Sequence, residues 1–138
     1  MFFITANNFR GAANRSKNYA YVFESYACLC DVLEIKHELG VNTRRVYYNN
    51  REQLADLILD YDEVARRLER FIEAFRVMWY TDNKPHGFDV QELRLGGLLL
   101  RIKSCRNRLQ QLLDGKIDKI AELEEKIVDY LFLPFRKH

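Results

Sequence analysis

Apolar residues that recur at alternating three- and four-residue steps constrain this chain more than any other feature. In the middle of the sequence the repeat consists of Tyr61, Val64, Leu68, Phe71, Phe75 and Met78. Such spacing places side chains on one face of an α-helix. The 138 residues include only 6 Gly and 2 Pro, so few turns are signalled and many short strands are disfavoured. The sequence therefore predicts an all-α protein.

A first long helix is expected from about Lys17 to Leu39, because apolar residues form two stripes along that segment. Gly40 follows directly and suits a left-handed C-terminal cap. Residues 41–50 would then form a short turn or helix.

A second helical segment is expected after Asn50, which can act as an N-cap with Gln53 as its capping-box partner. Asp60, with Glu63 three residues later, could begin a further helix, so a kink near Asp60 is one alternative. The apolar face of this segment continues to Trp79.

The loop "TDNKPHGF" separates this segment from the next helix, for which Asp89 is the predicted N-cap. That helix is expected to end at about Leu113, before Gly115. A last helix, capped by Asp118, would end at Pro134.

We therefore expect a bundle of four to five mostly antiparallel helices. Residues 1–16 are predicted to be an N-terminal lead-in segment, and residues 17–138 a single helical domain. The first residues, "MFFIT", could pair as an edge strand if more chain precedes them.

Charge and cysteine usage exclude several function classes. The net charge of +2, from 22 basic and 20 acidic residues, gives no strong attraction to nucleic acid or to an anionic membrane. No apolar run approaches the roughly 18 residues of a membrane span. Cys28, Cys30 and Cys105 lack metal-ligand spacing, so we expect reduced cysteines in a cytoplasmic protein with neither a metal nor a cofactor.

Two groups of residues could carry chemistry. Adjacent Asp62 and Glu63 could serve as an acid and an orienting group in glycoside chemistry, but acids at a helix N-terminus that complement its dipole are the favoured interpretation. Among the histidines, only His86 lies in a loop that could line a site.

Arg94, Arg101 and Arg108 are spaced seven residues apart and form one helical stripe. A stripe of basic residues can bind the phosphate groups of a nucleic acid, but this helix has no aromatic residues that would stack on the bases. We therefore favour ion pairs with acidic residues of neighbouring helices or of another domain over nucleic-acid binding.

Gly96 and Gly97 lie inside the same helix, where each glycine costs up to about 1 kcal/mol relative to alanine. Close approach of another backbone or of a bulky ring would compensate. Trp79 or Tyr80 is the candidate ring, because the intervening loop brings the two helix ends together.

Most of the chain, roughly Tyr26 to Leu131, resembles the C-terminal helical domain of certain bacterial glycoside hydrolase family 20 enzymes, the β-N-acetylhexosaminidases. The upstream features are Leu33, Lys36, Leu39, Gly40, Arg44 and Tyr47. The more specific block comprises Trp79, the loop Asn83-Lys84-Pro85-His86-Gly87-Phe88, Arg94-Leu95-Gly96-Gly97-Leu98, Arg101, Arg108-Leu109 and Gly115-Lys116-Ile117.

The resemblance implies a (β/α)8 barrel before this domain, with a catalytic Asp–Glu pair that acts on terminal N-acetylhexosamine residues. Asp62 and Glu63 lack the strand, His and Gly that precede the family's pair, and a barrel needs about 200 residues or more. The chain is therefore expected to be non-catalytic and inactive alone.

As an accessory domain, the chain would pack on the barrel, aid formation of a homodimer, and contact glycan only within the full-length enzyme. The substrate-edge or domain-interface candidates are Trp79, Asn83, Lys84, His86, Arg94 and Arg101, and the close-packing candidates are Gly96 and Gly97. The alternative is a standalone helical module for protein–protein interaction or dimerisation.

Overall fold

The computed structural model describes residues 1–125. Its elements are α1 (Phe2–Arg15), α2 (Ala20–Asn49), the 3₁₀ turn η1 (Arg51–Gln53), α3 (Leu54–Asp82), α4 (Phe88–Leu113) and α5 (Ala121–Glu124). Within this part of the chain no strand occurs, which confirms the all-α prediction.

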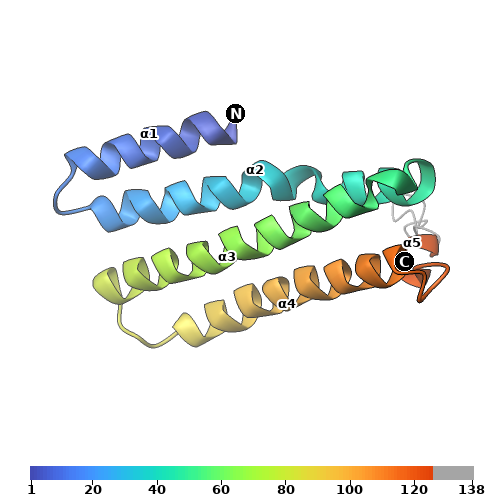
Figure 1. Cartoon of the computed structure of the whole chain (residues 1–138). Helices are drawn as coiled ribbons and strands as arrows, with labels where there is room; N and C mark the ends of the chain where they lie inside the picture. The colour runs from blue at the N-terminus through green and yellow to red at the C-terminus, as the bar shows by residue number, and fades with distance from the viewer. Residues whose placement is uncertain (126–138) are drawn as a thin grey trace, which may run out of the picture.

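The four long helices lie side by side in chain order and alternate in direction (Figure 1). Helix α1 packs along α2, α2 along α3, and α3 along α4. The loop between α3 and α4 is at one end of the molecule, and the α2–α3 connection is at the other end, close to α5 (Figure 1). The prediction of mostly antiparallel neighbours is confirmed.

One apolar core runs between α2, α3 and α4 and reaches the segment after α4. Its buried members are Val32, Leu39, Val46, Tyr47, Leu54, Leu57, Ile58, Tyr61, Val64, Ala65, Leu68, Ile102, Leu109, Leu112 and Ile120. On α3 these residues follow the three- and four-residue spacing that the sequence shows, so burial of this face explains why α3 forms.

Helix α2 continues through Gly40 to Asn49, so the predicted cap at Gly40 is wrong. Among the described residues, only Gly87 and Gly115 have a positive φ. The buried face of α2 extends beyond Gly40 through Thr43, Val46 and Tyr47. This burial stabilises the helix by more than the roughly 1 kcal/mol that one glycine costs.

Helix α3 shows no break at Asp60, and the alternative of a further helix starting there is wrong. Leu57, Ile58 and Tyr61 keep the buried face in register across that position. The start of α3 also differs from the prediction, because a 3₁₀ turn precedes it and the Asn50 side chain forms no capping hydrogen bond.

Helix α4 begins at Phe88, one residue before the predicted N-cap Asp89. Gly87 takes the N-cap position with φ of 98°, a conformation that favours glycine. Asp89 lies in the first turn, where its Oδ1 accepts a hydrogen bond from the Gly87 N–H at 3.1 Å. The predicted end at Leu113 is confirmed, and Gly115 follows with φ of 67°.

Residues 2–15 form helix α1, so "MFFIT" is helical and not an edge strand. Ala6 is fully buried, and the Phe9 ring stacks on Phe23 and Tyr26 of α2 at centroid distances of 6.5 and 5.6 Å. Residues 1–16, predicted as a lead-in, thus contain a helix packed on α2.

Two hydrogen bonds of the Tyr47 hydroxyl connect the segment after α4 to α2. The hydroxyl accepts a hydrogen bond from the Ile120 N–H at 3.1 Å and donates one to Glu124 Oε1 at 2.7 Å. Helix α5 starts at Ala121 with Ile120, not Asp118, at the N-cap position. The predicted helix end at Pro134 lies outside the described residues.

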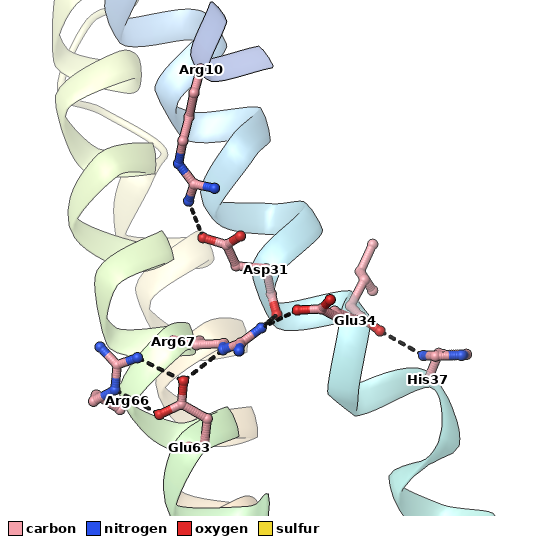
Figure 2. Close-up of polar contacts among 8 residues, drawn as sticks. Arg10, Asp31, Glu34, His37, Glu63, Arg66 and Arg67 are labelled. Atoms are coloured by element: carbon pink, nitrogen blue, oxygen red, sulfur yellow. Dashed lines mark hydrogen bonds and ion pairs between the residues drawn. The ribbon is translucent and has the colours of Figure 1, made fainter. Parts of the chain in front are cut away.

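Arg67 joins α2 to α3 through three acceptors (Figure 2). Its guanidinium donates to the Asp31 carbonyl oxygen at 2.7 Å, to Glu34 Oε2 at 2.6 Å and to Glu63 Oε1 at 2.8 Å. Asp31 in turn pairs with Arg10 of α1 (Figure 2). This chain of charges links three successive helices.

Candidate functional site

The α3–α4 loop is organised around Phe88, which is 1% exposed. The rings of Phe75, Trp79 and Tyr80 surround it at centroid distances of 5.8, 5.8 and 5.4 Å. The Arg76 guanidinium lies 5.7 Å from the Phe88 ring centroid. This anchoring role of Phe88 was not among the sequence predictions, although an aromatic residue directly after Gly87 is consistent with it.

Trp79 holds the loop through its ring and its ring nitrogen. Its Nε1 donates a hydrogen bond to the Lys84 carbonyl oxygen at 3.1 Å. A Cβ atom added to Gly87 would lie 3.6 Å from the Trp79 ring, which is ordinary contact, so the positive φ is what favours glycine there. Trp79 is half-buried and contributes to packing as well as to the loop surface.

The polar loop residues face solvent. Asn83, Lys84 and His86 are all exposed, and they follow Trp79 closely in the chain. Amide, ammonium and imidazole groups at such a surface can hydrogen-bond hydroxyl groups or an opposing protein surface. The structure therefore brings four of the candidate residues together, with Trp79 in the last turn of α3 and the other three in the loop that follows.

The two candidate arginines lie elsewhere on α4. Arg94 is exposed in the second turn of the helix. Arg101 is 13 residues beyond Phe88, which corresponds to about 20 Å along the helix axis. Arg101 therefore does not join the loop residues; it lines a cavity near the opposite end of the molecule.

The predicted ring over Gly96 and Gly97 is absent. A Cβ atom added at either glycine would meet nothing within 4 Å among the described residues. The Trp79 and Tyr80 rings pack on Phe88 instead. Since the described chain does not compensate these glycines, close packing of Gly96 and Gly97 against another domain stays a prediction.

An apolar strip accompanies the uncovered glycines. Val90, Leu93 and Leu100 are 42%, 77% and 67% exposed. With Gly97 they follow steps of three, four and three residues, so they share one side of α4. We call these four residues the open face of α4. Exposed leucines next to an exposed glycine on one helix face are typical of a surface that another protein element covers.

The acidic pair Asp62 and Glu63 is structural. Both residues lie in the interior of α3, so the predicted position at a helix N-terminus is wrong. Asp62 accepts two hydrogen bonds from Arg106, at 2.9 and 3.1 Å. Hydrogen bonds from Arg66 and Arg67 lower the pKa of Glu63 to about 2, so this carboxylate is ionised near neutral pH and cannot act as a general acid.

The arginine stripe is only partly paired. Arg108 Nη2 lies 3.7 Å from Glu122 Oε2. Arg94 and Arg101 form no ion pair within residues 1–125. The prediction of ion pairs with neighbouring acids therefore describes Arg108, while pairing of the other two with another domain stays a prediction.

The sequence was also compared with known protein families and with curated proteins. The family model of the Glycoside Hydrolase 20C C-terminal domain matches residues 2–134. The chain belongs to this family. The match includes all four long helices and the α3–α4 loop, so the resemblance seen in the sequence is confirmed. No curated protein matches the chain.

Residues 1–125 carry neither a membrane-spanning helix nor a metal-binding cluster. None of the helices there combines the length and apolar character that crossing a membrane requires. The same residues contain no cluster of three or more His, Cys, Asp or Glu side chains able to hold a metal ion.

Proposed function

We propose that the chain is the non-catalytic C-terminal helical domain of a β-N-acetylhexosaminidase, and that it packs on the catalytic barrel of that enzyme. The match to the Glycoside Hydrolase 20C C-terminal domain over residues 2–134 carries the proposal. The contacts of the acidic pair support a non-catalytic role, because Asp62 is hydrogen-bonded to Arg106 and Glu63, with its lowered pKa, is not available as an acid.

The open face of α4 is the proposed contact surface. Burial of apolar area contributes roughly 25 cal/mol per Å², so covering Leu93 and Leu100 favours association. Gly97 lets a partner backbone approach closely. Arg94, which forms no ion pair within residues 1–125, would meet an acidic group at the same interface. A homodimer through this face is a second arrangement consistent with the proposal.

The exposed loop residues would lie at the edge of the sugar-binding site of the enzyme. Asn83, Lys84 and His86 are exposed beside the half-buried Trp79, and they offer donors and acceptors to sugar hydroxyls. In this proposal the loop contributes to the catalytic site only when the barrel is present, and the enzyme is cytoplasmic.

An activity assay separates this function from the alternative of a standalone interaction module. With a chromogenic N-acetylglucosaminide, the isolated chain should be inactive, and a protein in which a family 20 barrel precedes the chain should be active. Leu93→Asp with Leu100→Asp should reduce the stability and activity of that longer protein.

The matched control is Leu59→Asp on α3, because Leu59 is 64% exposed and lies outside the open face. Equal effects of the two sets of variants would contradict the assignment of the contact surface. The standalone module would be favoured by two results together. Neither set of variants would change the stability or activity of the longer protein, and the isolated chain would self-associate.

A further inference from the structure

A cavity of about 280 Å³ opens between the second half of α2, α4 and the segment that follows α4. Three guanidinium groups line it, from Arg44 of α2 and from Arg101 and Arg108 of α4. The lining includes one carboxylate, that of Glu122. Three positive charges against one negative charge leave an excess of two positive charges around the cavity.

The described residues satisfy these cations only in part. Arg44 and Arg101 form no ion pair within residues 1–125. Arg108 reaches Glu122 only at 3.7 Å and donates from Nη1 to Gln111 at 3.1 Å. Its Nε is buried and has no hydrogen-bond acceptor in that part of the chain. Such an unsatisfied buried donor is unusual in proteins.

The hydroxyl groups of Thr43 and Tyr61, which also line the cavity, already form hydrogen bonds. The Thr43 hydroxyl donates to the Leu39 carbonyl oxygen at 2.6 Å. Because Thr43 has a single hydroxyl proton, the 2.9 Å contact between Thr43 and Tyr61 must have Tyr61 as its donor. The remaining side-chain donors of the lining are therefore the guanidinium groups, the Ser104 hydroxyl and the weakly donating Cys105 thiol.

We propose that this cavity binds a small oxyanion of the phosphate or sulfate type, held between Arg44 of α2 and Arg101 of α4. Guanidinium groups match the geometry of such anions through paired hydrogen bonds. The volume is slightly below the roughly 300–1,000 Å³ of drug-sized ligand sites, which suits one phosphate group, free or on a monosaccharide. The site goes beyond the proposed docking function, because it joins two helices of the chain itself.

Titration calorimetry on the full 138-residue chain tests the site with inorganic phosphate, at an ionic strength held constant with sodium chloride. The wild type should bind saturably, and its melting temperature should rise with phosphate. Arg44→Ala and Arg101→Ala should each raise the dissociation constant by about tenfold or more, since each removes a charge-assisted contact. Circular dichroism in the absence of phosphate verifies that both variants fold.

Arg94→Ala is the matched control, because Arg94 belongs to the same stripe on α4 but does not line the cavity. Its affinity for phosphate should equal that of the wild type. A parallel titration with glucose 6-phosphate distinguishes a free anion from a sugar phosphate, and either result with the same arginine dependence supports the site. The proposed anion site would be overturned if neither probe bound saturably, or if Arg94→Ala lost as much affinity for phosphate as Arg44→Ala and Arg101→Ala.

Discussion

At the scale of single residues, Glu63 shows how the charge network depends on pH. Hydrogen bonds from Arg66 and Arg67 lower its pKa from the ordinary value of 4.5 to about 2. Folding thus favours the ionised carboxylate, so the stabilisation is complete above pH 4.5 and is lost as the pH falls through 2.

Glu63→Gln should lower the free energy of unfolding by about 1 kcal/mol at pH 7, because the charged acceptor of Arg67 is removed. The difference from the wild type should shrink as the pH falls from 4.5 towards 2. Urea denaturation at several pH values measures it. Glu69→Gln, which breaks the exposed pair with Lys103, is the control and should change stability by less than about 0.5 kcal/mol.

The hydroxyl of Tyr47 gives a second prediction at this scale. Tyr47→Phe should cost about 1–3 kcal/mol, because it leaves the Ile120 N–H without its acceptor in a buried place. Tyr48→Phe removes only an exposed bond to the Leu123 carbonyl oxygen and should cost less than about 0.5 kcal/mol. Thermal unfolding of the two variants checks the order, and equal losses would show that the Ile120 N–H finds water.

Trp79 gives a third prediction. The ring packs on Phe75 and Phe88, and its Nε1 bonds to the loop backbone, so Trp79→Ala should destabilise the isolated chain by about 2 kcal/mol. Trp79→Phe should retain part of that stability. If Trp79→Ala leaves the unfolding transition unchanged, the ring is not part of the packing and is free to contact a sugar.

At the scale of elements, the apolar repeat was sufficient to predict α2, α3 and α4 and their antiparallel order, because burial of one face determines both. It did not predict α1, whose residues were expected to form a lead-in segment or an edge strand. The local signals were less reliable. A helix cap, such as those predicted at Gly40 and at Asp60, stabilises a helix end by about 1 kcal/mol. Burial of Tyr47 or Tyr61 stabilises the continuous helix by more than that. Element ends are therefore decided by packing that the sequence does not display.

The candidate site was predictable only where its residues are neighbours in sequence. The loop from Trp79 to Phe88 is one such stretch. By contrast, the cavity combines Arg44 with Arg101 and Arg108, and no local pattern connects α2 with α4. The two glycines of α4 illustrate the same limit, since the sequence predicts that something covers them, but no atom of residues 1–125 lies within 4 Å of a Cβ atom added at either position.

Gly97→Ala tests that interpretation of α4. In the isolated chain it should raise the free energy of unfolding by about 0.5–1 kcal/mol, because alanine favours a helix and open space surrounds the site. In the longer protein with the barrel it should instead weaken domain packing. Gly40→Ala on α2 is the control, because a Cβ atom added at Gly40 also meets nothing within 4 Å among the described residues. This substitution should raise the free energy of unfolding both in the isolated chain and in the longer protein.

At the scale of the whole molecule, the four helices pack one after another in chain order, and α4 has α3 on only one side (Figure 1). Among residues 1–125 no helix covers the open face of α4, so a contact there would leave the core undisturbed. This arrangement suits an accessory domain that must fold by itself and still offer a surface to a catalytic partner.

Cysteine labelling measures that contact most directly. Leu100→Cys would be made with Cys105→Ser, because Cys28 and Cys30 are buried whereas Cys105 is partly exposed. The account predicts fast reaction with a maleimide in the isolated chain and much slower reaction when the barrel is present. Leu59→Cys should react equally fast in both proteins. Equal labelling of Leu100→Cys with and without the barrel would contradict the account.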